Sequence, residues 1–497
     1  MAGACLFYND AGSTLASNIS SSTTTIQLSP GGGAQFSPAP GAGQFFVMTL
    51  LDAATGSFEE IVHVTQVVTD TLTVVRAQEG TAARAYLAGD FIANWNTAGQ
   101  MAGFAQSSAT NSIVTISTAT YSSYTSNIGQ TVERGYSGTM VDTLPAANSS
   151  LAGSVISIAN QSAGTAGILV IGPGAGSTIY SPQYAYGGAA HQWVYLSFGQ
   201  GCTLYTPDGT NWVTFQCPNR MRSEAGITVY CDSATGNDTN HGMLSTAPVQ
   251  HITTAALLAQ ALIDAASTQI TIQLFASSYV GNNAITGGVV GQALTTLNYG
   301  VNGAGGATAP PLSQMGALIL QGPASGTAVL SASSGPAVVR CGGQSSVVIN
   351  GAIEITSTGT FTAGLLIDPG ANVAIGNGPI FGACSGPQIW CAGTGYGAGN
   401  YSIIGGSSSH ILCSGSGARF NYSPVTVTIT GSPSFSGGWF LNVSVCGSLY
   451  TENVTWSGGI SAGQKYAAVT AGGINSNGSL TSIPGTSQTV TSPGWAV

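Results

Sequence analysis

Three carboxylates in the second half of the sequence are the side chains best suited to chemistry. After Asp264 the chain holds only Glu354, Asp368 and Glu452. Hydrolysis of a glycosidic bond normally uses two carboxylates about 5–9.5 Å apart. Glu354 and Asp368 could lie on different faces of the fold or at neighbouring corners. The three are therefore candidate catalytic residues of a glycan-degrading hydrolase or lyase.

Each of these carboxylates also has a structural explanation. Glu354 lies in GAIEITS and Glu452 in LYTENVTW, where alternation with apolar residues predicts an outward, solvated strand position. Asp368 precedes Pro369-Gly370, a turn-forming sequence. We expect these structural roles rather than catalysis.

The residues that could act as bases or as metal ligands do not cluster in the sequence. A lyase would want a basic group beside its carboxylate, but Arg340, Arg419 and Lys465 are far apart in the sequence. The loop that contains Asp232 and Asp238 could bind a cation, although Asx turns explain it better. The histidines are scattered, without a Ser/His/Asp grouping. The sequence thus predicts no metal site and no cofactor.

Aromatic residues are the candidate glycan-binding side chains. Sugar rings stack on aromatic faces, and Asn or Ser side chains supply hydrogen bonds. The predicted contacts lie on the outside of the C-terminal segment: Tyr396, Tyr401, Trp439 and Trp456. The alternative for each of them is packing in the core or between subunits.

The composition is almost without charge. The chain has 497 residues with 71 Gly, and only 5% are charged, against about 25% in ordinary soluble domains. A content of 43% hydrophobic residues argues against disorder. The net charge is −9 and Lys465 is the single lysine, which excludes a nucleic-acid-binding surface and a polybasic membrane patch. Such a chain must be solvated by Ser, Thr, Asn and backbone, or must hide surface in an assembly.

Cysteine usage and the N-terminal residues indicate a reducing compartment during synthesis. The nine cysteines are widely spaced without a CxxC pair, so we expect buried reduced thiols rather than disulfides or zinc ligands. The start MAGACLFYND lacks the features of a secretory signal. No apolar run approaches the ~18 residues that a membrane helix needs. We therefore expect the protein to be made in a cytoplasm and not to insert into a membrane.

The chain divides into three predicted segments. Residues 1–106 contain strand-like runs bounded by Gly, Pro and Asp and predict a small β domain. Residues 107–224 predict a β-rich connector, either a sandwich or a barrel. Residues 225–497 contain one apolar helix, 253–266, followed by short strands that restart every ~20–27 residues. The whole chain is therefore expected to be all-β.

That period predicts a parallel β-helix in the third segment. One coil of a β-helix takes about this many residues, and each coil stacks at the ordinary strand spacing of ~4.8 Å. Gly and Asn suit its corners. The helix 253–266 stands at the N-terminal end, where it can cap the first coil. The alternative is an irregular β-sandwich with Gly-rich loops.

Three stretches resemble proteins of tailed bacteriophages. VYCDSATGNDTNHGMLSTAPVQHITTAALLAQAL resembles the opening of pectate-lyase-like right-handed parallel β-helix domains. RAQEGTAARAYLAGD resembles the N-terminal region of phage tail fibre proteins, and YAAVTAGGINSNGSLTSIPGTSQTVTSPGWAV resembles their C-terminal ends. The resemblance to tail fibre and tailspike proteins implies a homotrimer, with residues 1–106 anchored to other tail or baseplate proteins of the virion and a distal receptor-binding part.

These observations predict a structural appendage of a phage tail that attaches to a host surface polysaccharide. A glycan-degrading spike of the same architecture is the alternative, because carboxylates from neighbouring subunits could pair. A bacterial β-helical adhesin is a third possibility, against which the lack of a secretion signal and of a translocator segment speaks. We expect binding rather than catalysis.

Overall fold

The computed structural model confirms an all-β chain with a parallel β-helix. It describes residues 4–497 apart from 10, 104–112, 163–166, 182, 184–191, 223–225, 265–268, 282, 287–317, 453, 479, 492 and 493. Backbone contacts divide the chain into two compact units, Met1–Ser112 and Ile113–Val497. The predicted three-domain division at 106 and 224 stays a prediction. In the described part, no helix is long and apolar enough to span a membrane.

The first unit is a mainly antiparallel sheet. Its order is β2-β7-β4-β5-β6-β3, with β1 parallel to β4. Apolar side chains of β4 and β5, among them Phe46, Met48, Leu50, Val62 and Val64, form one core. The elements are β1 Ala4–Leu6, β2 Gly12–Thr14, β3 Thr25–Gln27, β4 Gln44–Leu51, β5 Phe58–Val68, β6 Thr71–Gln78, β7 Phe91–Ala93, η1 Gly32–Gln35 and α1 Ala98–Gly103.

The second unit begins with two sheets that share one core around Trp212, which makes this region a sandwich rather than a barrel. β16 and β17 pair antiparallel and form a hairpin around Asp208-Gly209. One sheet contains β8 Ile113–Ile116, β10 Thr131–Arg134, β12 Val155–Asn160, β14 Ile179–Tyr180, β16 Gly201–Tyr205 and β17 Trp212–Phe215; the other contains β9 Thr120–Tyr121, β11 Met140–Thr143, β13 Leu169–Gly172 and β15 Val194–Leu196.

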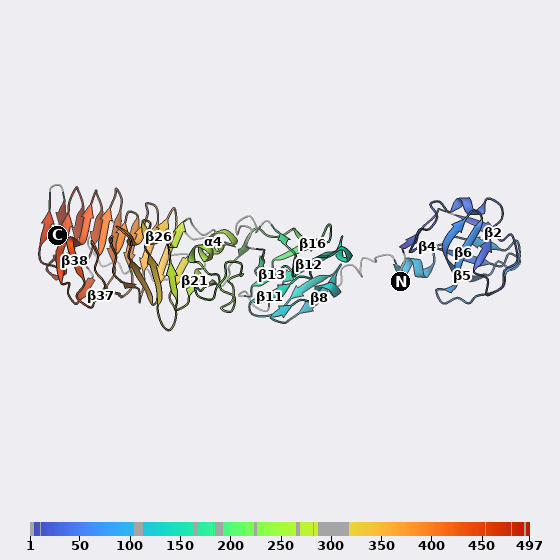
Figure 1. Ribbon diagram of the computed structural model, residues 1–497, viewed down its shortest axis with the longest axis horizontal. Coiled ribbons are helices and arrows are strands. Elements are labelled where there is room, and N and C mark those ends of the chain that lie inside the picture. Colours follow the sequence, from blue (N-terminus) through green and yellow to red (C-terminus); the bar gives the residue numbers. More distant parts are fainter. Residues whose placement is uncertain are drawn as a thin grey trace. The chain divides into compact units, whose positions relative to one another are not determined.

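The parallel β-helix follows, built from three sheets that the chain visits in turn (Figure 1). The first sheet contains β19 Ile227–Cys231, β21 Ile270–Leu274, β24 Leu318–Gln321, β27 Ser346–Asn350, β30 Asn372–Ile375, β33 Thr394–Gly397, β36 Arg419–Tyr422, β39 Ser448–Tyr450, β42 Gly473–Asn475 and β44 Trp495–Ala496. The second contains β22 Ser278–Val280, β25 Ala328–Ala332, β28 Ile353–Ser357, β31 Ile380–Phe381, β34 Tyr401–Ile403, β37 Val425–Ile429 and β40 Val454–Ser457. The third contains β23 Asn283–Thr286, β26 Ala337–Gly342, β29 Ala363–Ile367, β32 Ile389–Cys391, β35 Ile411–Ser414, β38 Ser434–Ser444, β41 Ala462–Ala468 and β43 Gln488–Val490.

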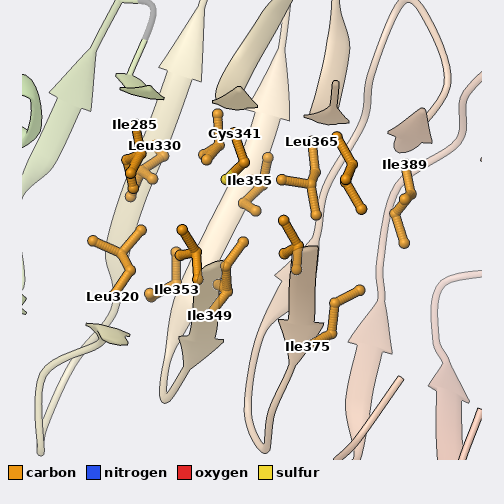
Figure 2. Close-up of a cluster of buried hydrophobic side chains, with 14 of the residues drawn as sticks. Ile285, Leu320, Leu330, Cys341, Ile349, Ile353, Ile355, Leu365, Ile375 and Ile389 are labelled. Carbon is orange, nitrogen blue, oxygen red and sulfur yellow. The ribbon is translucent and has the colours of Figure 1, made fainter. Parts of the chain in front are cut away.

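Inward side chains stack in register along the lumen. In the first sheet Ile349 lies beside Ile375, and in the third Leu365 lies beside Ile389. Figure 2 shows these side chains meeting between the strands, and each is buried. Burial of one such side chain stabilises by about 1.5–3 kcal/mol. Repetition in every coil gives the helix its core.

Asparagines form a hydrogen-bonded ladder at the corner between the first and second sheets. The Oδ1 atom of Asn350 accepts from the backbone N–H of Asn377 (2.9 Å), and that of Asn377 accepts from the N–H of Asn400 (2.9 Å). Gly351 and Gly378 follow in left-handed conformations, φ 79° and 98°, which glycine adopts without steric cost. The prediction that Asn and Gly make the corners is confirmed.

The predicted capping helix is present but ends earlier than expected. α4 spans Ile252–Leu262, and the chain then turns extended into β20, Ile263–Asp264, which pairs with β18, Met221–Arg222. The predicted end at 266 was wrong because this pairing takes Ile263 out of the helix. Ala255 and Leu258 are buried in the lumen core, whereas Leu257 is 54% exposed. The helix therefore covers the first coil with one face.

The sandwich and the β-helix share buried contacts. Val170 and Tyr195 belong to the same apolar cluster as α4. The hydroxyl of Tyr195 donates to the carbonyl of His241 (3.2 Å), and the indole N–H of Trp193 donates to the carbonyl of Thr239 (2.9 Å). Continuous packing of this kind fixes the sandwich on the capped end.

A buried ion pair gives a test of the sandwich. Nε of Arg134 lies 2.7 Å from Asp142, both side chains are fully buried, and the remaining guanidinium N–H groups donate to the carbonyls of Ile116 and Thr118. Asp142→Ala leaves a buried cation without its partner. We expect a loss of about 3–5 kcal/mol in local stability, measured by hydrogen exchange of the amides in β10 and β12.

The matched control is Asp368→Ala, which removes the partly exposed pair of Asp368 with Arg340. It should change the stability of its coil by less than about 1 kcal/mol. Equal exchange rates in the Asp142→Ala variant and the wild type would show that the buried pair does not hold the sandwich together.

Candidate functional site

The structure places the three candidate carboxylates on three different elements of the coil. Glu354 faces outward from β28, between buried Ile353 and Ile355, as its alternation predicted. Its neighbours in register are Val329 and Ile380, so no second carboxylate flanks it along the sheet. Glu452 is exposed but lies in a turn after β39; its predicted strand position was wrong.

Asp368 lies beyond the end of β29 and accepts a hydrogen bond from Nε of Arg340 (2.7 Å). From the sequence, Arg340 was noted only as lying far from Arg419 and Lys465. The coil repeat brings Arg340 and Asp368 together, because Arg340 pairs with Leu366 one coil on. The signal was present in the sequence, since their separation is close to one predicted coil. The catalytic role of the three carboxylates stays a prediction.

Two of the four candidate aromatics face inward, contrary to expectation. Tyr401 is 2% exposed and points into the lumen. Trp456 faces inward from β40, the last strand of the second sheet, and packs on the ring of Phe440 at 5.0 Å. The alternation of Tyr401 with Ser402 and Ile403 already gave Tyr401 the inward position. Both residues serve the core.

The other two aromatics are not part of the lumen core but are largely covered. Tyr396 lies on the outer face of the first sheet, in register with Ala374, and is only 3% exposed. Trp439 is half-buried on β38, next to an irregularity in its pairing with β41, and its indole N–H meets no hydrogen-bond partner in the described residues. Glycan binding by the four aromatics stays a prediction.

A hydrogen-bonded network occupies the lumen around His410. Nε2 of His410 lies 2.7 Å from the Tyr401 hydroxyl, which lies 2.5 Å from that of Tyr422, and Nδ1 lies 2.8 Å from Oε1 of Gln388. The Gln388 amide N–H groups donate to the carbonyls of Gly382 and Gly405. This fixes the amide, so Nδ1 of His410 donates and Nε2 accepts.

The surroundings of His410 keep it neutral. Rings of Phe381, Phe440 and Trp456 pack around it, and the polar groups that face it are the uncharged Gln388 and Tyr401. Burial lowers the pKa of His410 to about 3 and raises the pKa of Tyr401. When His410 is neutral, each of its ring nitrogens has a hydrogen-bond partner. An imidazolium would have no anionic partner among the groups that face it.

The loop that precedes α4 is built from Asx turns, as predicted. Oδ1 of Asp232 accepts from the N–H of Ala234 (3.0 Å), and Oδ1 of Asn237 accepts from the N–H of Thr239 (2.9 Å). Asp238 has a different role. Its Oδ1 accepts from the N–H of His251 (3.0 Å), and its Oδ2 lies 2.5 Å from Nδ1 of the same residue.

The Asp238–His251 pair is partly exposed. Burial acts to raise the pKa of Asp238, but the His251 side chain and the backbone N–H groups of His251 and Gln250 outweigh it, and the pKa lies below its usual value. Asp238 is therefore an anion that holds the imidazole in one orientation. This contact was not predicted from the sequence, because a separation of 13 residues gives no periodic signal.

A cleft of about 200 Å³ opens beside the Asp238–His251 pair. It lies between the loop that precedes α4 and β22, the first strand of the second sheet. It is lined by Ser233, Gln250, His251, Ile252, Ser278, Tyr279, Val280 and Asn283. The Ser233 hydroxyl donates to the carbonyl of Ser278 (2.6 Å), so it is not directed at the imidazole as a nucleophile would be. Val280 is 73% exposed at the cleft. Hydroxyl, amide and imidazole groups around an apolar side chain suit the hydrogen bonding of a small polar ligand.

The thiols are mostly structural. Six of the cysteines are buried: Cys202, Cys231, Cys341, Cys384, Cys391 and Cys413. Cys391 and Cys413 stack in register inside the lumen. In the described residues, no three His, Cys, Asp or Glu side chains gather where they could hold a metal ion.

Comparison with known proteins gives a remote likeness among solved structures. No protein-family model and no curated protein matches the sequence. Among solved structures, the Gp54 tailspike of Acinetobacter baumannii bacteriophage AP22, in complex with A. baumannii capsular saccharide, matches with a TM-score of 0.14 and 13% identity. The match covers 95% of this chain and 63% of the tailspike. A likeness this low carries no argument about activity or ligand.

The His410 network predicts that the protein loses stability in mild acid. A histidine free in the unfolded chain binds a proton below pH ~6.5, whereas folded His410 does so only near pH 3. Stability is therefore full above pH ~6.5 and falls as the pH drops toward 3, by up to about 1.4 kcal/mol per pH unit. In His410→Gln the side chain still offers one hydrogen-bond donor and one acceptor, but it does not take up a proton in this pH range. Its thermal midpoint should fall less than that of the wild type between pH 7 and 4.

His241, whose pKa burial lowers to about 4, is present in both proteins. The difference between their pH profiles therefore isolates His410. If the thermal midpoints of the wild type and His410→Gln fell by the same amount between pH 7 and 4, the assignment of His410 as neutral would be contradicted.

Proposed function

We propose that this chain is a tail fibre or tailspike subunit of a tailed bacteriophage, which attaches the particle to a glycan on the host surface. The observation that carries the proposal is the parallel β-helix with an almost chargeless exterior. The three resemblances to phage tail proteins support the same assignment, and they also support residues 1–106 as the part that joins other tail or baseplate proteins.

The outer face of the second sheet has the chemistry of a carbohydrate-binding surface. Ser402, Thr428 and Ser457 follow one another in register, one coil apart. Thr426 and Thr455 form a second pair beside them. Hydroxyls at ~4.8 Å intervals on a rigid sheet match the many hydroxyls of a polysaccharide, and the cleft at the first coil adds an enclosed position.

We propose the outer face of the third sheet as the contact between subunits of a homotrimer. Leu366, Trp390 and Leu412 lie in register on this face. The neighbouring coil contributes Arg340, which is held by Asp368. An outward apolar column of this kind gains stability when another copy covers it. Three copies would also raise a weak affinity for a repetitive glycan.

Binding to purified polysaccharides tests the proposed function. The full chain should bind at least one member of a panel of bacterial capsular polysaccharides and O-antigens, measured by biolayer interferometry, without releasing oligosaccharide. Release of oligosaccharide would favour the depolymerase alternative. Absence of binding across a panel that includes the host polysaccharide would contradict attachment through a glycan.

Introducing a charge into the apolar column tests the trimer. Wild-type protein should show three times the 49.6 kDa chain mass by light scattering. Trp390→Glu should shift this mass to that of a single chain, because a buried carboxylate at the contact has no partner. Thr428→Glu, the control on the second sheet, should leave the mass unchanged. A wild-type monomer at micromolar concentration would rule out the homotrimer.

A further inference from the structure

Three turns that join the second sheet to the third stack in successive coils and form one edge. The N–H of Ala363 donates to the carbonyl of Pro336 (3.0 Å), and the N–H of Gly386 donates to that of Thr362 (3.0 Å). Backbone hydrogen bonds therefore run from each turn to the next. We call this the stacked edge: residues 333–336, 358–362 and 383–387.

Phe361 is the unusual residue of the stacked edge. Its φ is +53°, in the left-handed region, and its side chain is 61% exposed. A bulky residue in this region is a steric outlier, since its Cβ crowds the following carbonyl. An exposed phenylalanine also gains little from burial. Neither the backbone nor the side chain at this position favours phenylalanine for the fold alone.

The neighbouring coils hold Phe361 in its conformation. Thr362 is fully buried, its hydroxyl donates to the carbonyl of Gly335 (3.0 Å), and its N–H donates to Oγ of Ser385 (3.0 Å). The Ser357 hydroxyl donates to the carbonyl of Thr362 (2.8 Å). Contacts from both sides thus fix the peptide after Phe361, and the ring projects into solvent. Backbone strain that is held this firmly is typical of ligand-contact positions.

The surroundings of Phe361 specify the class of ligand. The three turns contain no charged residue, and their exposed side chains include the hydroxyls of Ser333, Thr358, Thr360 and Ser385. An aromatic face packs on the C–H face of a sugar ring, while hydroxyls beside it donate and accept hydrogen bonds. A charged ligand would find no counter-charge here.

We propose that Phe361 is the stacking platform for a neutral sugar unit of the bound glycan. The proposal rests on the proposed attachment function and adds to it a position and a ligand class. It also explains the strained backbone at Phe361: the stacked edge keeps an aromatic ring at a position whose left-handed conformation would suit glycine better. A second copy of the chain packed on Phe361 is the competing occupant.

A pair of glycine substitutions separates glycan contact from simple relief of strain. Phe361→Gly removes an exposed apolar side chain from a left-handed position. Val445→Gly does the same at another turn, where Val445 has φ +50° and is 50% exposed. Both variants should unfold at a higher temperature than the wild type, because glycine adopts this conformation freely.

The two variants should differ in binding. The probe is a printed array of purified, uncharged capsular polysaccharides and O-antigens. On the polysaccharide that the wild type binds, Phe361→Gly should weaken affinity about tenfold or more. Val445→Gly and Phe361→Trp should stay within about threefold of the wild type.

Each other outcome overturns the proposal in a distinguishable way. Unchanged binding by Phe361→Gly refutes the role of Phe361 and leaves the attachment function standing. An equal loss in Val445→Gly shows that the effect is not local to the stacked edge. A changed particle mass in Phe361→Gly, measured by light scattering, assigns the residue to a subunit contact. A wild type that binds none of the polysaccharides refutes both this inference and glycan attachment through a neutral sugar.

Discussion

Parallel pairing of successive coils is the constraint on which the rest of this structure depends. Each strand donates and accepts backbone hydrogen bonds with the coil before and the coil after it, so every inward position repeats along the lumen. Apolar side chains at these positions build one continuous core without help from charge. The helix α4 covers the end of the core at which the first coil would otherwise expose it.

The same pairing decides where chemistry can occur. Residues about one coil apart in the sequence become neighbours on a face or an edge, as Arg340 and Asp368 do. In the later coils the outer face of the second sheet carries the hydroxyls of Ser402, Thr428 and Ser457, and on the third sheet Leu366, Trp390 and Leu412 follow one another in successive coils. A chain with so few charges can present a neutral, hydrogen-bonding surface to a glycan and an apolar one to its own copies.

The sequence predicts much of the fold because the repeat is periodic. The strand restarts, the Asn and Gly corners and the capping helix are all read from local patterns, and each is present. Alternation also placed Glu354 correctly. It was not applied to Tyr401, which was predicted to lie on the outside as a candidate sugar contact, whereas its hydroxyl meets His410 in the lumen. A buried polar network of this kind leaves no sequence pattern. The Asp238–His251 pair and the strained Phe361 depend on loop geometry, which periodicity does not describe.

We propose that the side of the β-helix holds a neutral glycan. Hydrogen exchange of the full chain, with and without a saturating polysaccharide, tests this proposal, because bound ligand slows exchange of the amides that it covers. We expect protection in residues 333–336, 358–362 and 383–387 and in strands of the second sheet. Protection confined to residues 4–103, with the coils unchanged, would contradict it.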